Sequence, residues 1–402
     1  MSDYDASSVD SGKQDFSNFI ELQNTVIGNY HLFYLLGKGA YAQVWLAFNH
    51  IKKEFYALKI QHPDDFEAAR KELQILKQIE KLPYKIEVIE SFIFTINITE
   101  QQIKEKYYVI VFPVYGSNLE DLSKLEVFDE GFGESIVKKF TKQTLQNFII
   151  LHNKYHLIHC DIKPDNFLLS YPDYKIRKLM DAYDKNKFIK IYKKVLEKNP
   201  KIILDKSSDI STREKLHKEI VNDINFEQIL NYKITEEELL NQLKKSNFLI
   251  SDFGSFCNIE EKYDEDFGTR YYRSPENILV SEDLNYATDI WSLGCTIYEL
   301  LTNHILFDPI KCNKYTTDQY HLSEIFQLGK FSNKEIKSFQ RKKDFYHKDK
   351  CIRTLPKTDS IIEKINYIKN NFWKGLILSM LTVSYKKRPT SNELLTQFKS
   401  EQ

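Results

Sequence analysis

The hydrophobic pattern of this chain changes its period once, near Ser117, and that change limits the folds it can adopt. Before it, short apolar runs are broken by turn residues, as in strands joined by tight turns. These runs cover residues 30–60, 87–98 and 106–114, and a helical pattern covers 66–82. After Ser117, apolar residues mostly recur at helical spacing, with one long segment over 135–159. This order predicts an α+β fold with a small, mainly β first lobe containing one helix and a larger, mainly α second lobe.

Composition narrows the class of protein. The 402 residues are 42% hydrophobic, and 57 basic side chains balance 57 acidic ones, so direct nucleic-acid binding is not expected. No apolar run reaches the roughly 20 residues that span a bilayer, and the N-terminal residues lack the apolar core of a signal peptide. Five scattered cysteines without a C-x-x-C pair predict reduced thiols. We expect a monomer that is cytoplasmic, or both cytoplasmic and nuclear, and not bound to a membrane.

A charged insert at 170–245 interrupts the second lobe and holds 17 basic and 13 acidic side chains. We place an N-terminal tail at 1–29, the first lobe at 30–115 and the second lobe at 116–398. Apolar residues at helical spacing from Phe188 to Leu196 predict one helix within the insert. The capping pair Thr235 and Glu238 predicts a second helix.

The first motif with chemical content is the glycine pair Gly37 and Gly39, which separates two strand-like runs. Glycines at such a turn let backbone N–H groups approach phosphates, because no Cβ stands in the way. Alone, the pattern is more typical of a plain hairpin turn. Lys59 lies on the next strand but one, within reach of such phosphates, and Glu72 on the following helix is placed to pair with it.

Two further motifs carry groups suited to phosphoryl transfer. In the stretch 159–166, Asp161 would accept a hydroxyl proton, Lys163 would steady the transferring phosphate, and Asn166 would ligate a divalent ion. The tripeptide 252–254 is Asp-Phe-Gly, a metal-binding carboxylate beside a hinge glycine. Taken singly, the stretch 159–166 also fits a polar loop, and an Asp-Phe-Gly tripeptide is common enough to occur by chance.

Together, in this order and at these intervals, the motifs match the signature set of protein kinases. From about residue 30 to about residue 398, outside the insert, the chain resembles a eukaryotic-type protein kinase. The resemblance implies a bilobal kinase fold, the cofactors ATP and Mg²⁺, and phosphorylation of hydroxyl groups on a protein substrate. Lys163 in D-x-K-x-x-N looks like the serine/threonine-selective form of the loop.

The resemblance also assigns roles by position. The implied catalytic residues are Asp161, Lys163 and Asn166, and the implied metal ligands are Asn166 and Asp252. The implied ATP-binding residues are Leu36, Gly37, Lys38, Gly39, Ala42, Val44, Ala57, Lys59, Glu72, Phe112 and Val114, where Ala42 replaces the family's third glycine. Thr269, Arg273 and Glu276 belong to the activation segment and the substrate side. Arg388 is the implied partner of Glu276, and Asp289 is implied to brace the catalytic loop.

The segment from Thr269 to Glu276 resembles the CMGC group, which contains the cyclin-dependent, mitogen-activated, dual-specificity tyrosine-regulated and SR-protein kinases. The position of the insert is most like that of the SR-protein kinases, which implies Arg-Ser-rich substrates. Those kinases hold several acidic residues before the position of His321. Here Asp318 remains, but the next two residues are not acidic. A Pro-directed or dual-specificity kinase therefore stays open.

Cys160 stands where the family has an arginine that binds an activation-loop phosphate. We hypothesise that this chain needs no such phosphorylation, because the acidic run 260–266 orders the loop through its own contacts. The alternatives are that Cys160 is a small packing residue and that the run is a solvated face.

Two questions stay open at this level. The complete set of phosphotransfer residues favours an active kinase, with a pseudokinase scaffold as the alternative. The basic first half of the insert, 170–206, is suited to docking a regulatory partner. Alternatively, the insert is a helical bracket packed on the kinase lobes.

Overall fold

The protein is described by a computed structural model over most of the chain. The described residues are 22–39, 41–98, 103–183, 190, 194, 197, 210–260, 267–283, 285–311, 313–347, 350–351 and 356–400. The chain forms two compact units: the first comprises 1–70, 87–114 and 174–232, and the second comprises 71–86, 115–173 and 233–402. Helix α1 (Phe66–Gln78) begins in the first unit and ends in the second.

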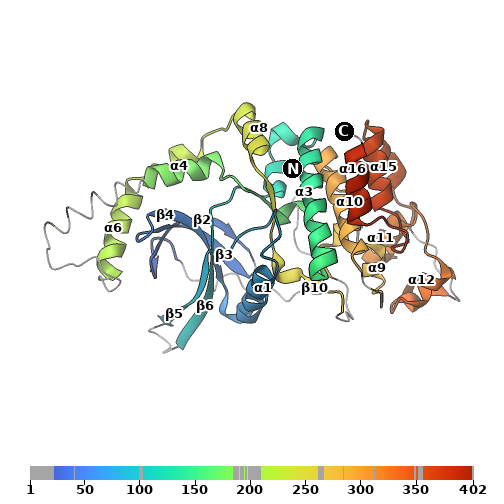
Figure 1. The fold of residues 1–402 in the computed structure, drawn as a ribbon, viewed down its shortest axis with the longest axis horizontal. Coiled ribbons are helices and arrows are strands. Elements are labelled where there is room, and N and C mark those ends of the chain that lie inside the picture. Colours follow the sequence, from blue (N-terminus) through green and yellow to red (C-terminus); the bar gives the residue numbers. More distant parts are fainter. Residues whose placement is uncertain are drawn as a thin grey trace. The chain divides into compact units, whose positions relative to one another are not determined.

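A six-stranded antiparallel sheet is the centre of the first unit (Figure 1). Its strands, in spatial order, are β1 (Val26–Ile27), β2 (Tyr30–Lys38), β3 (Ala42–Asn49), β4 (Glu54–Gln61), β6 (Ile103–Phe112) and β5 (Glu90–Ile98). The predicted strand runs are confirmed. The expected tail at 1–29 is too long, however, because Val26 and Ile27 already pair with His31 and Tyr30.

Both faces of this sheet are apolar, so both need cover. One face holds a cluster that includes Tyr30, Trp45, Leu58 and Val109. The opposite face holds Phe33, Leu46 and Phe48, and these pack against helices from the insert. A sheet that is buried on both sides explains why its strands lack a clean alternation of apolar and polar residues.

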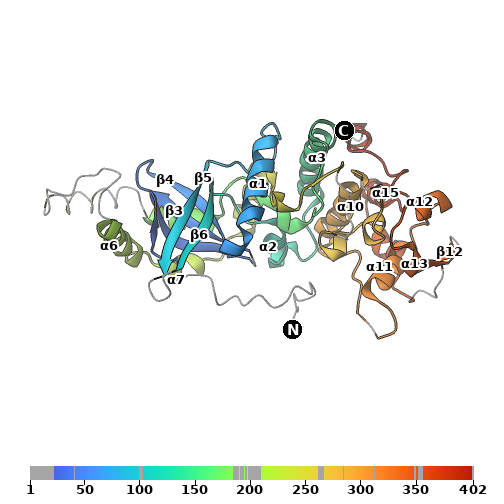
Figure 2. The ribbon, with the colours of Figure 1, turned by 90° about the horizontal axis from the view of Figure 1, so that it is seen from below.

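The covering helices are α4 (Tyr174–Tyr183), α6 (Ile210–Asn222) and α7 (Phe226–Leu230), which lie beside the sheet in Figures 1 and 2. The buried members of the apolar cluster that they contribute are Leu179, Tyr183, Leu216, Ile220 and Val221. The first unit therefore holds more helix than the single helix expected for the first lobe. For these three helices the bracket interpretation of the insert agrees with the structure. The predicted helix at 188–196 falls largely outside the described residues.

The second unit is mainly helical. Its larger helices are α3 (Glu134–Ile150), α8 (Glu236–Lys245), α10 (Ala287–Thr302), α11 (Thr317–Ile325), α15 (Asn371–Met380) and α16 (Ser391–Ser400). Its shorter helices are α2 (Leu119–Ser123), α9 (Pro275–Ile278), α12 (Asn333–Lys337), α13 (Lys342–Phe345) and α14 (Ile361–Asn366). Two-stranded pairs complete it: β7 (Leu157–Ile158) with β10 (Cys257–Asn258), β8 (Phe167–Leu169) with β9 (Phe248–Ile250), and β11 (Tyr346–His347) with β12 (Lys350–Cys351).

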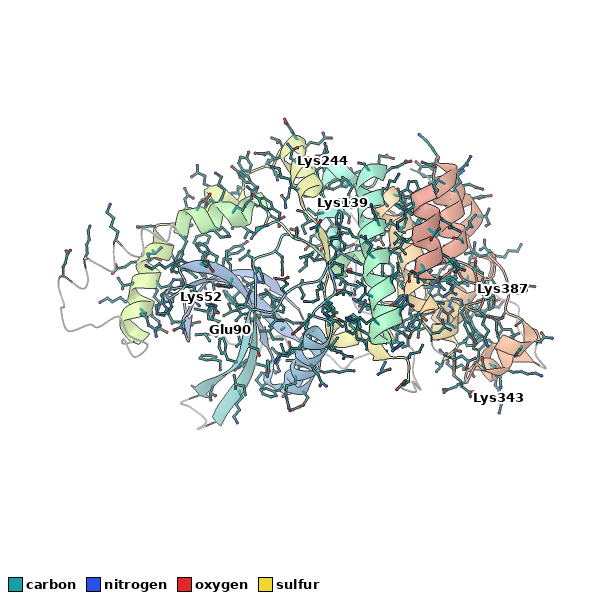
Figure 3. All side chains as sticks on the ribbon, in the orientation of Figure 1. Lys52, Glu90, Lys139, Lys244, Lys343 and Lys387 are labelled. Atoms are coloured by element: carbon teal, nitrogen blue, oxygen red, sulfur yellow. The ribbon has the colours of Figure 1, made fainter. Side chains whose placement is uncertain are left out.

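Two local predictions have different outcomes here. The helix expected over 135–159 is too long: α3 ends at Ile150, a π-helical turn follows, and a left-handed His156 leads into β7. The capping box of Thr235 and Glu238 at the start of α8 is confirmed. The end of α8 is held from α3, because Lys139 Nζ donates to the carbonyl of Lys244 at 2.8 Å (Figure 3).

No helix in the described part of the chain is both long and apolar enough to cross a bilayer.

Candidate active site

The sheet of the first unit gathers several of the predicted nucleotide-binding residues on one face. In the register of β3, β4 and β6, Lys59 lies opposite Val44, and Ala57 lies opposite Phe112. Directly opposed residues of antiparallel strands share a face, as do residues two apart along one strand. Val44, Ala57, Lys59 and Phe112 therefore point to the same side of the sheet. Ala42 and Val114 are buried at its ends.

The two glycines of the β2–β3 turn are not required by packing. Among the described residues, no atom lies within 4 Å of the position that a Cβ would take at Gly37, and at Gly39 the nearest is the Ala42 carbonyl oxygen, 3.8 Å away. Neither glycine has a positive φ. Leu36 is half-buried before this turn and Lys38 is exposed within it. The space above the glycines is open to a ligand.

In the second unit, the buried Asp289 of α10 holds the loop that contains Asp161. Its carboxylate accepts the backbone N–H groups of His159 at 2.9 Å and Cys160 at 3.1 Å, and it also contacts His152 Nε2 at 3.0 Å. Cys160 has a φ of 71°, a conformation unfavourable for a residue with a Cβ. The bond to Asp289 stabilises this backbone, so the predicted bracing role of Asp289 is confirmed.

The Asp161 side chain is held on several sides. Its Oδ1 accepts the Thr269 N–H at 2.8 Å, and its Oδ2 lies 3.2 Å from Lys163 Nζ and 3.1 Å from Asn166 Nδ2. Burial by itself raises the pKa of Asp161, but the Lys163 charge and the Thr269 hydrogen bonds outweigh it, and the pKa is lowered. Asp161 is therefore ionised at neutral pH.

Asn166 and Asp252 present oxygen atoms suited to a hard cation. The Asn166 amide donates to the Asp161 carbonyl at 2.7 Å as well as to its carboxylate, so its own oxygen is the atom left for a metal. Asp252 has a φ of 59°, a strained backbone of the kind that clusters at functional sites. Among the described residues no group of three or more His, Cys, Asp or Glu side chains forms a metal site. A cation held by Asn166 and Asp252 would complete its shell with water or substrate oxygens.

The segment that follows residue 266 makes several contacts with the loop that contains Asp161. Lys163 Nζ donates to the Thr269 hydroxyl at 2.7 Å, and Arg273 Nε donates to the Gly268 carbonyl at 2.8 Å. A Cβ at Gly268 would lie 2.3 Å from the Cys160 carbonyl oxygen, so only glycine fits this close approach. Asp161, Thr269 and Arg273 line one small pocket. The acidic run expected to order this segment lies almost wholly outside the described residues.

The predicted pair of Glu276 and Arg388 is confirmed and buried. Arg388 Nη1 and Nη2 donate to the two carboxylate oxygens at 2.6 and 3.0 Å, and neither side chain is exposed to solvent. This two-point ion pair connects α9 to the chain that precedes α16.

Comparison with known proteins decides the family. The model of the protein kinase domain matches residues 30–191 and 206–398. The chain belongs to the protein kinase family. This kinase is 29% identical to the "Serine/threonine-protein kinase SRPK" of Physarum polycephalum, over 96% of this chain and 90% of that protein. It is 23% identical to the "Putative serine/threonine-protein kinase L205" of Acanthamoeba polyphaga mimivirus, over 80% and 76% of the two chains.

A third relative extends the comparison. The kinase is 25% identical to the human "Dual specificity tyrosine-phosphorylation-regulated kinase 3" over 69% of this chain and 34% of that one. These matches confirm the expected serine/threonine protein kinase with an α+β kinase fold, and the resemblance to the CMGC group and its SR-protein kinases.

Two further predictions concern Glu72 and Cys160. Glu72 is buried in the part of α1 that belongs to the second unit, whereas Lys59 belongs to the first, so their pairing stays a prediction. Cys160 is buried beside Ile158 and Cys257, which agrees with the packing interpretation of this residue. Burial raises the pKa of the Cys160 thiol well above its usual value, so it stays protonated.

The sequence did not reveal two sets of contacts near this loop. His152 shares the Asp289 carboxylate, yet it lies 137 residues away in sequence. Asp318 accepts from Arg270 Nη1 at 2.5 Å and from Arg341 Nη2 at 2.8 Å. No local motif marks these partners. Arg270 and Arg341 lie 48 and 23 residues from Asp318 in sequence, so no nearby residue pattern indicates this pairing.

Proposed function

We propose that this serine/threonine kinase uses Asp161 to align the acceptor hydroxyl and take its proton as the hydroxyl oxygen attacks the γ-phosphorus of ATP, while the bond from that phosphorus to the β–γ bridging oxygen breaks and ADP leaves. Asp161 is buried, ionised and aimed by three neighbours, as a general base needs to be. Lys163, beside both Asp161 and Thr269, is placed to neutralise charge on the transferring phosphoryl group. The ionised, fully oriented Asp161 carboxylate is the observation that carries this proposal.

We propose Asn166 and Asp252 as the residues that would hold magnesium. Magnesium typically takes one or two protein oxygen ligands and completes its shell with water and substrate phosphates. An amide oxygen without a hydrogen bond among the described residues and one carboxylate fit that requirement. When bound, the ion would neutralise phosphate charge. The role of the two side chains is to set where it sits.

The nucleotide is assigned to the open glycine turn and the sheet face beneath it. Leu36, Gly37, Lys38 and Gly39 would contact it from the turn, and Ala42, Val44, Ala57, Phe112 and Val114 from the sheet. Lys59 would hold its phosphates, with Glu72 as the partner of Lys59. The open space at the glycines and the shared face of Val44, Ala57 and Lys59 support this assignment.

Substrate preference is the finer question, and Asp318 bears on it. Arg270 and Arg341 occupy both of its carboxylate oxygens, and this pairing lowers the pKa of Asp318 against the raising effect of burial. A substrate arginine would have to displace one of them. We therefore propose that Thr269 and Arg273 position the acceptor, and that a preference for Arg-Ser repeats, if present, does not depend on Asp318.

We also propose that the kinase acts in the cytoplasm or nucleus. The thiols of Cys160, Cys257 and Cys295 are free and buried, which suits a reducing compartment.

The test of the catalytic assignment compares wild type with Asp161→Asn, using labelled ATP, Mg²⁺ and a panel of Arg-Ser peptides, Pro-directed peptides and a basic protein. Phosphate transfer should fall by about 10²- to 10⁴-fold, while ATP binding is retained. Asp165→Asn is the matched control, since Asp165 is exposed in the same loop. Transfer that survives Asp161→Asn, or no transfer by wild type, would overturn the assignment.

The same panel tests the substrate proposal with Arg341→Ala. This change leaves Asp318 with one arginine and frees one carboxylate oxygen. Because the proposed preference does not depend on Asp318, the use of Arg-Ser peptides relative to Pro-directed peptides should stay as in wild type, and a rise in the use of Arg-Ser peptides would contradict the proposal.

A further inference from the structure

The insert packs on the same sheet face that carries the proposed nucleotide-binding residues. Leu46 on β3 lies opposite Ala57 on β4, so the two side chains share that face. Leu46 also belongs to the apolar cluster that contains Tyr183 of α4 and Leu216 of α6. Val114 is a member of the same cluster. The face therefore continues from the proposed nucleotide-binding residues into the contact surface of the insert, all within the first unit.

Helix α6 covers the part of the β2 edge that β1 does not pair with. Among the described residues β1 pairs only Val26 and Ile27 with β2, and one more bond joins the Leu32 N–H to the Thr25 carbonyl at 3.0 Å. The carbonyl of Leu32 accepts a hydrogen bond from α6, because His217 Nε2 lies 2.7 Å from it. Covering a strand edge with a helix satisfies such groups without a further strand.

The state of the His217 ring follows from its contacts. A carbonyl only accepts, so Nε2 carries the proton and donates it to Leu32. Burial lowers the pKa of His217 to about 4, so the ring is neutral at pH 7 and Nδ1 accepts the Tyr183 hydroxyl at 2.8 Å. The Tyr183 ring stacks on Phe33 of β2, with centroids 4.6 Å apart. The insert thus holds β2 through its backbone and through its side chains.

Helix α7 reaches the part of β2 that leads into the glycine turn. The Phe226 ring stacks on Tyr34 with centroids 6.2 Å apart and planes 15° from parallel. Leu36, the residue before Gly37, packs against the same apolar cluster. The ladder between β2 and β3 is irregular at both Leu32/Tyr34 and Leu35/Gly37. Since the ladder is interrupted there, packing against the insert is needed to fix the course of the strand.

From these contacts we propose that α6 and α7 of the insert set the nucleotide affinity of the kinase by holding β2 and its glycine turn in place. Phe226 and His217 are positioning residues in this account, and the inference rests on the proposed role of the glycine turn in binding ATP. Coupling of this kind is reciprocal: if docking of the insert strengthens ATP binding, ATP must stabilise the docked insert by the same factor.

The test compares Phe226→Ala with Gln228→Ala, a change at an exposed position of the same helix. Loss of an aromatic stack should raise the KM for ATP by about three- to tenfold, with kcat and the KM for peptide within about twofold of wild type. Phe226→Tyr should restore the wild-type KM, and Gln228→Ala should not change it. In wild type, MgATP should slow amide exchange in 210–230.

A folded Phe226→Ala protein with the wild-type KM for ATP would overturn the inference, as would a rise confined to kcat or to the peptide KM. If Phe226→Ala does not fold, Phe226→Leu replaces it, with the same ATP-selective rise expected. The two proposals fail in different ways. A wild-type protein that transfers no phosphate contradicts the proposed function. If the wild type is active, but Phe226→Ala does not change the ATP affinity and MgATP does not slow amide exchange in the insert, only this inference is contradicted.

Discussion

The two units hold their functional residues by different means. In the second unit, buried charged side chains hold the functional residues. Asp289 binds the backbone of the loop that contains Asp161, and Glu276 binds Arg388. In the first unit, Lys59 and its neighbours lie on strands, and the insert secures those strands by apolar packing and the neutral His217.

The difference follows from the backbone that each unit has to fix. Strands satisfy their own N–H and C=O groups through the ladder, so the sheet needs only shape and packing to fix its side chains. The loop that contains Asp161 has no such ladder at His159 and Cys160, so their buried N–H groups need other acceptors, and the Asp289 carboxylate supplies them. The second unit should therefore be sensitive to the loss of single charges and the first unit to the loss of fit.

The largest effect is expected for Glu276→Ala. It leaves Arg388 buried without its counter-ion, and such a loss costs about 3–5 kcal/mol of unfolding free energy. Denaturant unfolding at pH 7 measures it. The control is Asp283→Ala, which removes an ion pair with Lys386 whose side chains are 55% and 47% exposed, and which should cost less than about 1 kcal/mol. Equal losses in the two variants would contradict the role given to buried charge.

The pH dependence of stability tests the effect of one buried carboxyl group in the second unit. Burial raises the pKa of Glu299 in α10 to about 8, although the Tyr272 hydroxyl donates to it at 2.6 Å. Between pH 4.5 and 8 the unfolded chain loses this proton and the native protein keeps it, so stability falls as pH rises. The loss is on the order of a few kcal/mol. Glu299→Gln should flatten the decline in Tm between pH 6 and 8.5; an unchanged slope would assign the decline to other groups.

Asp289→Asn should come next. An amide retains one accepting oxygen but turns an NH₂ group toward backbone donors, which leaves a buried N–H unsatisfied at a cost of about 2–3 kcal/mol. Because the misplaced loop carries Asp161, kcat should fall while the KM for ATP changes little. Steady-state kinetics and thermal unfolding measure the two effects. A selective loss of ATP affinity would show that Asp289 acts elsewhere than on the catalytic loop.

The smallest effect is expected in the first unit, for Tyr183→Phe. The ring and its stack on Phe33 remain, but His217 Nδ1 loses its donor, at a cost of about 1–2 kcal/mol. Faster amide exchange in 210–222 would locate the loss in α6. Tyr367→Phe is the control, since the Tyr367 side chain is 68% exposed. Identical behaviour of the two variants would remove the hydrogen bond from the account of how the insert docks.

Much of the fold was predictable because its signals are local. The strands of the first unit, the capping box of α8 and the change from strand to helix periodicity each depend on residues within a few positions of one another. The predicted boundaries failed where distant pairing decided them. Val26 and Ile27 join the sheet because β2 offers them an edge, and α3 ends before residue 157 because β7 pairs with β10.

For the site, motif order picked out Asp289 and the pair of Glu276 with Arg388, whose contacts the structure confirms, whereas the roles of Asp161, Asn166 and Asp252 stay predictions. The motifs could not show which side chains complete the environment of these residues. Thr269 and His152 hydrogen-bond to Asp161 and Asp289, yet they lie 108 and 137 residues from them in sequence. A buried polar group needs a hydrogen-bond partner, and that partner can come from any part of the chain that packs beside it.

By itself, the sequence determined the family, the residue types of the chemistry and the presence of a charged insert, because each depends on identity and spacing along the chain. Only the tertiary structure decided where the insert packs. Its helices α4, α6 and α7 place the buried Tyr183 and His217 and the partly buried Phe226 against β2 of a sheet that comes before them in sequence. An apolar helix face shows that it needs a partner, but the partner is set by the shape and unpaired groups of a distant surface.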